Sequence, residues 1–251
     1  MKAMILAAGA GTRLKPMTDK MPKALVPVGG VPMLEQIILK IKTAGFTHLV
    51  INIHHLGEQI IDFLASKNNF GLNIDISDER DYLLDTGGGI KWAGRFLDGD
   101  EPFLVHNVDI FSDVDLREMY RSHISSKALA TLLVSPRQNA RQLLFNNEEL
   151  LCGWRNRATG EIKSSFPNFD PSKHLEYAFG GVHMISSEIF RLMEEWTGKF
   201  SVINFYLSVC PLQPVRFYTE EEIMLIDAGK PEGLDKAERW VSQQKNLFRE
   251  I

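Results

Sequence analysis

Residues 9–28 read Gly-Ala-Gly-Thr-Arg-Leu-Lys-Pro-Met-Thr-Asp-Lys-Met-Pro-Lys-Ala-Leu-Val-Pro-Val. They follow a short apolar run, residues 3–8, which predicts a buried strand that leads into a loop at the carboxyl edge of a sheet. Glycines in such a loop let backbone N–H groups approach a phosphate, and Arg13 and Lys23 supply positive charge. Its prolines restrict the loop and lower the entropy lost on ligand binding. The stretch therefore predicts a phosphate-binding loop.

Two common phosphate loops do not match this sequence. The chain contains no Gly-x-x-x-x-Gly-Lys-Ser/Thr string, which a P-loop requires. A dinucleotide-binding loop needs Gly or Ala three residues after its second glycine, and Leu14 stands at that position. An ordinary Gly/Pro-rich surface loop with incidental charges remains the alternative.

The pattern Gly-x-Gly-Thr-Arg-Leu-x-Pro-Met-Thr-x-x-x-Pro-Lys resembles the signature of sugar-phosphate nucleotidylyltransferases. The resemblance implies nucleotidylyl transfer (EC 2.7.7.-) from a nucleoside triphosphate to a sugar 1-phosphate, with release of pyrophosphate. It implies Arg13 and Lys23 as catalytic cations. The nucleotide-binding residues that it implies in this stretch are Ala8, Gly9, Gly11, Thr12, Arg13 and Lys23.

The composition is that of an ordinary globular protein: 251 residues, 44% apolar and 24% charged, with a net charge of −4. The small negative charge argues against nucleic acid as a partner. Two cysteines are too few for a disulfide framework, so a reduced, intracellular setting is expected. No apolar run approaches the ~18 residues that a membrane span requires, and the apolar start of the chain is too short for a secretory signal. We expect a soluble, cytoplasmic protein without membrane contact, either a monomer or a homodimer.

Apolar patterns in the first half alternate between strand and helix. The expected strands are 3–8, 48–53, 73–77 and 103–107, and the expected helices are 33–44, 56–66 and 88–96. Such alternation predicts a mainly parallel sheet with ligands beyond the carboxyl ends of its strands. The loops after Ala8, Ile53, Ser77 and Asn107 should therefore share one crevice.

The second half predicts a partly antiparallel arrangement. The expected strands are 129–134, 142–145, 150–154, 176–183, 215–218 and 224–227. The expected helices are 116–124, 187–196 and 202–209. A last helix is expected from about Glu232 to the chain end, with an apolar face that includes Phe248. The polar stretch 155–174 is expected to be a lid or a sugar-contacting loop. We expect one nucleotidyltransferase domain over 1–251, with a nucleotide-binding half, 1–128, and a sugar-binding half, 129–251.

The fold class expected from this order of elements is α/β, a Rossmann-like three-layer α/β/α arrangement around a mixed sheet. The resemblance implies the nucleotide-diphospho-sugar transferase (GT-A-like) fold.

Two carboxylates stand where the resembled family carries its Mg²⁺ ligands. Asp109 follows the apolar strand 103–107, and Asp227 ends the strand 224–227 before a Gly-x-Pro turn. The family has Gly, Trp and Thr where this chain has Val108, Leu225 and Lys230, which changes the surroundings and leaves both acids in place. The alternative for each acid is a helix cap or a solvated side chain.

Three further segments carry candidate binding residues. Glycines at the start of the helix after residue 85 leave N–H groups free for a base or ribose, so Thr86, Gly87 and Gly88 are assigned to the nucleotide, with a flexible turn as the alternative. Asn107, Gly180 and Gly181 are assigned to the sugar, with a turn former and a plain β-bulge as alternatives. Arg137 and Arg141 are expected in solvent, with contact to the sugar's phosphate as the alternative.

Among subfamilies, the motifs look most like those of N-acetylmuramate 1-phosphate uridylyltransferases. Short mannose- or heptose-1-phosphate guanylyltransferases carry much the same motifs, so guanylyl transfer stays open. A glycosyltransferase that uses Asp113 and Asp115 is a second alternative, although Asp115 is also placed to cap a helix. A non-catalytic regulator that binds a nucleotide-sugar is a third.

Overall fold

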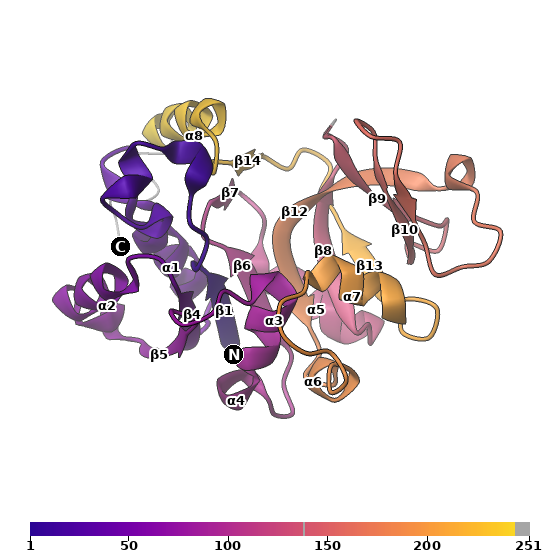
Figure 1. Ribbon diagram of the computed structural model, residues 1–251, viewed down its shortest axis with the longest axis horizontal. Helices are drawn as coiled ribbons and strands as arrows, with labels where there is room; N and C mark the ends of the chain where they lie inside the picture. Colours follow the sequence, from indigo (N-terminus) through magenta and orange to yellow (C-terminus); the bar gives the residue numbers. More distant parts are fainter. Residues whose placement is uncertain (138, 244–251) are drawn as a thin grey trace.

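The computed structural model describes residues 1–137 and 139–243, and most of its described strands form one mixed sheet. The order in this sheet is β11-β10-β9-β12-β6-β1-β4-β5, with β8 between β12 and β13 (Figure 1). Its strands are β1 (Lys2–Leu6), β4 (His48–Ile53), β5 (Asn73–Asp78), β6 (Phe103–Asn107), β8 (Ala130–Ser135), β9 (Arg141–Phe145), β10 (Leu151–Asn156), β11 (Ile162–Lys163), β12 (Leu175–Ile185) and β13 (Val215–Tyr218). Two short pairs lie outside it: β2 (Pro27–Val28) with β3 (Val31–Pro32), and β7 (Ile110–Ser112) with β14 (Leu225–Asp227).

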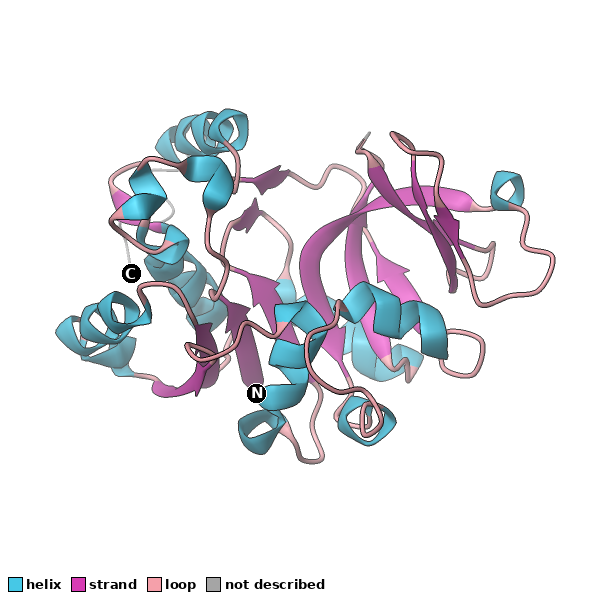
Figure 2. Ribbon diagram, viewed as in Figure 1, coloured by secondary structure: helices cyan, strands magenta, loops and turns pink. Residues whose placement is uncertain are grey.

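Side chains alternate between two hydrophobic cores, one on each face of the sheet. In β1, Ala3 and Ile5 belong to one core and Met4 to the other, as the two-residue period of a strand requires. The first core includes residues of α1 (Met33–Thr43), α2 (Gly57–Ser66), α5 (Leu116–Ser126) and α8 (Pro231–Gln243). The second includes residues of α3 (Asp85–Trp92), α4 (Gly94–Leu97), α6 (Ile189–Leu192) and α7 (Val202–Val209). The expected three-layer α/β/α architecture is therefore confirmed (Figure 2).

The strand order reverses at β1. This strand pairs in parallel with β4 on one side and with β6 on the other, while the chain runs from β1 to β4 and β5 before it returns to β6. Crossover connections therefore leave β1 and β6 in opposite directions. A crevice opens at such a point beyond the carboxyl ends of the strands.

The helices differ from the sequence expectation in three places. The helix expected at 88–96 begins earlier, at Asp85, and is divided into α3 and α4. The helix expected at 187–196 is reduced to α6, and after it the N–H groups of Glu194 and Trp196 donate to carbonyls three residues back, at Arg191 and Met193, so the chain continues in turns. The closing helix is described as far as Gln243. Phe248, which is predicted to lie on its apolar face, is outside the described residues.

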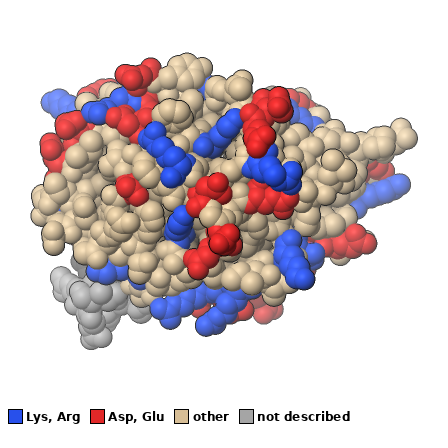
Figure 3. Space-filling model, turned by 90° about the horizontal axis from the view of Figure 1, so that it is seen from below, with Lys and Arg blue, Asp and Glu red and all other residues tan. Residues whose placement is uncertain are grey.

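Surface features of the described residues are ordinary. No helix within 1–137 or 139–243 has the length and apolar character needed to cross a bilayer. Both cysteines carry free thiols, with Cys152 buried and Cys210 half-buried. On the face shown in Figure 3, Lys and Arg side chains alternate with Asp and Glu side chains.

Candidate active site

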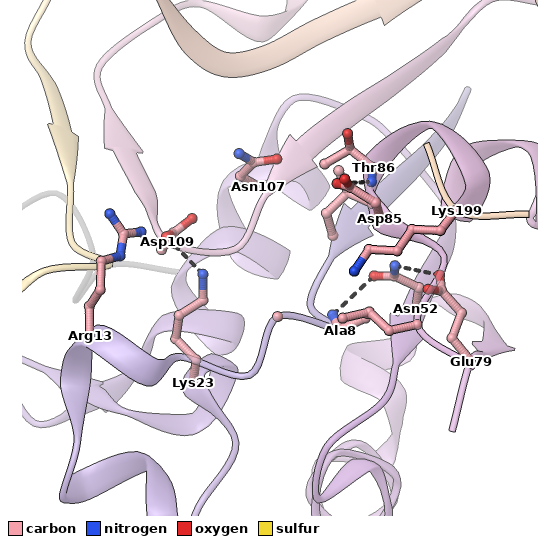
Figure 4. A pocket seen from close by; sticks show the side chains of 13 residues that line it. Ala8, Arg13, Lys23, Asn52, Glu79, Asp85, Thr86, Asn107, Asp109 and Lys199 are labelled. Atoms are coloured by element: carbon pink, nitrogen blue, oxygen red, sulfur yellow. Dashed lines mark hydrogen bonds and ion pairs between the residues drawn. The ribbon is translucent and has the colours of Figure 1, made fainter. Parts of the chain in front are cut away.

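A cavity of about 440 Å³ lies at the carboxyl edge of the parallel strands (Figure 4). Its lining residues are Leu6, Ala8, Gly9, Arg13, Lys23, Asn52, Glu79, Leu83, Asp85, Thr86, Asn107, Asp109 and Lys199. The segments that follow β1, β5 and β6 thus share one crevice, as predicted. The fourth predicted loop differs, since β4 contributes Asn52 from within the strand and no residue beyond Ile53.

Asp109 and Asp227 are brought together by the small β7–β14 pair. Asp227 is the Cα partner of Ile110, and the N–H of Ala228 donates to the carbonyl of Asp109 at 2.8 Å. The turn after β6 and the end of β14 are therefore fixed side by side. Asp109 is buried and Asp227 half-buried, so both carboxylates are partly withdrawn from water.

Gly229 marks the point on which the charged groups converge. A Cβ built there would overlap Oδ2 of Asp109 and would lie 3.0 Å from both Asp227 Oδ1 and Arg13 Nη2. The absence of a side chain at this position lets the two carboxylates and the guanidinium approach the same point of the backbone. Gly229 also donates its N–H to Asp227 Oδ1 at 3.0 Å, which orients that carboxylate.

Lys23 completes the charged end of the cavity. Its Nζ lies 2.8 Å from Asp109 Oδ2, and the two side chains are 13% and 9% exposed. Its position follows from the loop after β1, where Gly11 adopts a φ of +64° and packs against the side chains of Thr18 and Lys23. Arg13, Lys23 and Asp109 thus meet at one end of the cavity (Figure 4). Asp227 does not line the cavity and lies next to this group at Gly229.

The donor set at this end suits a divalent cation. Carboxylate oxygens are the protein ligands that Mg²⁺ prefers, and it usually takes one or two of them together with substrate phosphates and water. Asp109 and Asp227 supply two such groups, and both approach Gly229. The described residues contain no group of three or more His, Cys, Asp or Glu side chains placed to hold a metal, so any remaining ligands would come from bound phosphates and water.

Other residues of the phosphate loop have different positions. Ala8, Gly9 and Arg13 line the cavity as predicted, whereas Gly11 and Thr12 lie outside its lining. The carbonyl of Gly11 accepts hydrogen bonds from Leu14 N and Thr18 Oγ1, so this residue shapes the loop. Its assignment as a nucleotide contact, with that of Thr12, is not supported by the cavity.

The prediction that Gly87 and Gly88 offer free N–H groups is wrong. Both donate to the carbonyl of Phe200, at 2.9 and 3.2 Å. A Cβ on Gly87 would overlap the Phe200 ring, and one on Gly88 would lie 2.6 Å from the carbonyl oxygen of Gly198. These glycines therefore allow the close packing of α3 against the 198–200 segment. Only Thr86 of the three reaches the cavity.

Gly180 and Gly181 form a bulge in β12. The register with β8 shifts between Phe179 and His183, and Gly181 has a φ of +72°. A Cβ on Gly181 would lie 2.8 Å from Nδ2 of Asn107. Because Asn107 lines the cavity, Gly181 packs against a cavity residue without lining the cavity itself. The bulge alternative is therefore correct, and neither glycine lines the cavity. The stretch 155–174, which includes β11, does not line it either.

A buried polar network that the sequence analysis missed forms the opposite end of the cavity. Asn52 Oδ1 accepts from Ala7 N and Ala8 N at 2.7 and 3.3 Å, and its Nδ2 donates to Glu79 Oε1 at 2.7 Å. Glu79 Oε2 accepts from Leu84 N at 3.1 Å. Burial raises the pKa of Glu79, while the hydrogen bond from Asn52 opposes that rise. The network ties the ends of β1, β4 and β5 together, and a polar Asn52 inside an apolar strand was its only sequence signal.

Lys199 and Asp85 were also missed. Lys199 enters the cavity from the segment between α6 and α7, and its ammonium group points toward Asn52 and Ala8 (Figure 4). Nothing in the local sequence marks this lysine, because its place in the cavity depends on the packing of α3 against residues 198–202. Asp85 begins α3 with a φ of +60° and accepts from Thr86 N at 2.6 Å.

Two arginines of the second half lie outside the cavity. Arg141 is exposed, as expected, but Arg137 is half-buried. Arg137 donates to the carbonyls of Leu225 and Phe179, at 3.4 and 3.2 Å, and thereby joins β14 to β12. Burial lowers the pKa of Arg137, and the negative charge of Asp227 offsets part of this shift. The expectation of a solvated Arg137 is wrong, because its position next to β14 gives it two backbone acceptors.

Asp113 and Asp115 have structural roles. Asp113 Oδ1 accepts from Met224 N at 2.9 Å, and Asp115 caps α5 by accepting from Arg117 N and Glu118 N. Neither residue lines the cavity. The helix cap proposed for Asp115 is therefore confirmed, and the cavity gives the glycosyltransferase alternative no support.

Known proteins resemble this chain in sequence. It is 45% identical over 122 residues to N-acetylmuramate alpha-1-phosphate uridylyltransferase of Neisseria meningitidis serogroup B, an alignment that covers 49% of the chain and 52% of the relative. It is 37% identical over 137 residues to mannose-1-phosphate guanyltransferase of Gibberella zeae, covering 54% of the chain and 37% of the relative. The chain thus spans about half the length of the uridylyltransferase and less of the guanyltransferase.

Solved structures resemble it over almost the whole chain. UDP-glucose pyrophosphorylase from Acinetobacter baumannii superposes with a TM-score of 0.76 at 18% identity, covering 99% of this chain and 98% of that one. HddC from Yersinia pseudotuberculosis gives 0.75 at 22% identity, covering 95% and 98%. The expected nucleotide-diphospho-sugar transferase fold is thereby confirmed. The sequence model described as nucleotidyl transferase matches residues 2–143, and the chain belongs to that family.

Proposed function

We propose that the protein transfers a nucleotidyl group from a nucleoside triphosphate to a sugar 1-phosphate, with Mg²⁺, UTP and N-acetylmuramate 1-phosphate or a related hexose 1-phosphate as reactants. The observation that carries this proposal is the convergence of Arg13, Lys23 and Asp109 at one end of a cavity, with Asp227 next to them at Gly229. The activities for which the uridylyltransferase and guanyltransferase relatives are named support it.

The reaction needs little from the protein beyond positioning and charge. A phosphate oxygen of the sugar 1-phosphate attacks the α-phosphorus, the bond from that phosphorus to the oxygen bridging to the β-phosphate breaks, and pyrophosphate leaves. The attacking phosphate is already an anion, so no strong general base is required. The protein holds two anionic reactants in line and stabilises charge on the leaving group.

The charged residues divide this work. Arg13 holds the β- and γ-phosphates, and Lys23 neutralises charge that develops at the α-phosphate. Asp109 and Asp227 would hold Mg²⁺, which when bound neutralises phosphate charge. Thr86, with the Asn52–Glu79 network behind Ala8, frames the nucleoside, and Asn107 faces the sugar.

Pyrophosphate release is the direct test. Purified protein with Mg²⁺ is incubated with each nucleoside triphosphate and with N-acetylmuramate, mannose, glucose and heptose 1-phosphates. We expect the highest rate with UTP and N-acetylmuramate 1-phosphate, and a loss of at least ~10²-fold in Arg13→Ala, the scale for one preorganised charge contact. Highest rates with GTP and mannose or heptose 1-phosphate would establish the guanylyl alternative. If the protein binds a nucleotide-sugar but releases pyrophosphate with no pair of nucleoside triphosphate and sugar 1-phosphate, it is the non-catalytic regulator instead.

A further inference from the structure

A second pocket, of about 490 Å³, lies against α3 and the segment that leads from α6 to α7. Its volume is within the range of small-molecule sites, roughly 300–1,000 Å³. None of its lining residues lines the active-site cavity, to which α3 contributes only Asp85 and Thr86. The two are therefore separate sites. The lining residues of the second pocket are Leu84, Gly88, Lys91, Trp92, Arg95, Trp196, Thr197 and Gly198.

Two tryptophans give this pocket flat apolar surfaces. Trp92 is 48% exposed, and its Nε1–H donates to the carbonyl of Asp78 at 3.2 Å, which restricts the orientation of the indole. Trp196 is half-buried and packs against the rings of Phe200 and Phe205, with centroids 5.0 and 5.5 Å apart. Indoles that are fixed in place and still accessible suit a planar ring, since every nucleobase can stack on an aromatic side chain.

Arg95 adds a positive charge beside the indole of Trp92. Its guanidinium lies 4.8 Å from the ring centroid of Trp92 and 4.7 Å from that of Phe96, so two rings hold it in place. The carboxylate of Asp78, which senses the charge of Arg95, is ion-paired with Arg80 instead. A guanidinium that is oriented in this way can bind a phosphate through two parallel hydrogen bonds.

Lys91 is the second cation of the pocket. Its Nζ donates to the carbonyls of Glu194 and Trp196, both at 2.8 Å, which fixes the ammonium group and leaves one of its three N–H groups for another acceptor. The described residues that line the pocket include no Asp or Glu. The lining therefore combines two positive charges with two indoles, and its charge is complementary to an anion.

We propose that this pocket is a second nucleotide site, which binds a nucleoside diphosphate, either free or as part of a nucleotide-sugar. The base stacks on the indoles of Trp92 and Trp196, and the two phosphates bind Arg95 and the remaining N–H group of Lys91. A planar ring alone would leave the cations without a partner, and an inorganic anion alone would leave the indoles exposed. The proposal requires no activity at the cavity that contains Arg13.

Calorimetry with UDP counts the sites without turnover. We expect the wild type to bind two equivalents, one in the cavity and one in the pocket. The pocket equivalent should weaken by about 5- to 150-fold in Trp92→Leu, the range for one stacked base. In Arg95→Gln it should weaken by about 10- to 100-fold, the range for a hydrogen bond to a charged group. Both side chains are exposed, so both variants should fold.

Two further variants serve as controls for this titration. Arg13→Ala should show the reverse result, with a weaker cavity equivalent and an unchanged pocket equivalent. Arg121→Gln removes an arginine whose side chain is 71% exposed on α5, outside both sites, and should bind UDP as the wild type does.

Fluorescence tests the chemistry of the ligand, because Trp92 and Trp196 are two of the four tryptophans. UDP should quench the emission, and Trp92→Leu should reduce this effect. Uridine and inorganic pyrophosphate each lack one half of the ligand and should bind at least ~10-fold more weakly than UDP. Tighter binding of UDP-N-acetylglucosamine than of UDP would identify a nucleotide-sugar as the ligand, and the opposite order would identify the free diphosphate.

Three results would overturn the proposal. The first is a single equivalent of UDP in the wild type, and the second is two equivalents of unchanged affinity in both Trp92→Leu and Arg95→Gln. The third is pyrophosphate that binds the pocket as tightly as UDP, which would make it a site for anions alone. A failure to release pyrophosphate from any pair of reactants would refute the proposed function and leave this inference intact, because UDP binding is measured without turnover.

Discussion

Lys23 Nζ lies 2.8 Å from Oδ2 of Asp109, so this lysine holds the carboxylate that the proposed metal would bind. The two positive charges would compete for one oxygen. Repulsion between unit charges 4 Å apart is about 1 kcal/mol even in bulk water.

Lys23→Met should therefore bind a bare divalent cation more tightly, by at least about fivefold, because a repulsion of at least ~1 kcal/mol is removed. The same variant should lose at least ~10²-fold in turnover, since the α-phosphate loses its cation. Mn²⁺ titration followed by electron paramagnetic resonance measures the first effect, and pyrophosphate release measures the second. Unchanged or weaker Mn²⁺ binding would show that Lys23 does not compete.

The two acids of the cavity should differ from the neighbouring Asp113 and Asp115. Asp109→Asn and Asp227→Asn each remove a charge next to Gly229, and we expect turnover to fall by at least ~10²-fold. Asp113→Asn and Asp115→Asn keep an oxygen that accepts the same backbone hydrogen bonds, so their turnover should stay near that of the wild type. Full activity in Asp109→Asn would remove this residue from the metal site.

Gly229→Ala tests whether the position next to both acids must lack a side chain. The new methyl group would overlap Asp109 Oδ2 and lie 3.0 Å from Arg13 Nη2, so we expect Mn²⁺ binding and turnover to fall by at least ~10²-fold. Circular dichroism and the urea midpoint serve as controls for folding. A folded variant with normal Mn²⁺ affinity would show that this position is not at the metal site.

Gly87→Ala should destabilise the fold, because its methyl group would overlap the Phe200 ring. Overpacking of this kind costs about 1–3 kcal/mol in the free energy of unfolding. Phe200→Leu gives the added methyl group more room, so the double variant should lose less than the two single variants summed. Strict additivity in urea unfolding would mean that the two sites do not interact.

Three buried histidines should make stability fall in acid. Burial lowers the pKa of His106 and of His183 to about 3, and that of His123 to about 4. The charge of Lys40 adds to the shift of His106, and the charge of His106 adds to that of His183. Their ordinary value is 6.5, so the unfolded chain binds these protons first as the pH falls. The stabilisation is complete above pH 6.5 and decreases below it, by about 1.4 kcal/mol per pH unit for each histidine.

Urea unfolding between pH 7 and pH 5 measures this slope before most carboxylates titrate. His123→Gln should reduce it by about one histidine's share of 1.4 kcal/mol per pH unit, whatever it does to the stability at pH 7. His123 is suited to this test because its ring nitrogens form hydrogen bonds with the uncharged hydroxyls of Thr131 and Ser186, at 2.8 and 3.1 Å. A slope that matches the wild type would assign the acid sensitivity to other groups.

Much of the site was predictable because it is local in the sequence. Ala8, Gly9, Arg13 and Lys23 belong to one short loop after a strand, and strand periodicity with turn chemistry places that loop at the sheet edge. The parallel part of the sheet and the crevice follow from alternating strands and helices with right-handed crossovers. The glycines of α3 and β12 were misassigned because their neighbours, Phe200 and Asn107, are far away in the chain. A sequence shows that a glycine is needed without showing what approaches it.

The α/β class, the phosphate-binding loop and the family resemblance could be read from the amino-acid sequence, because periodicity and motif spacing are properties of short segments. That Asp227 lies beside Asp109 through the β7–β14 pair, and that Lys199 enters the cavity, became visible in the folded chain. Contacts between distant segments depend on how the whole chain packs, since many pairings are compatible with the same local patterns. The packing of α3 against residues 198–202 is such a contact, and it sets the charge at the end of the cavity opposite the acids.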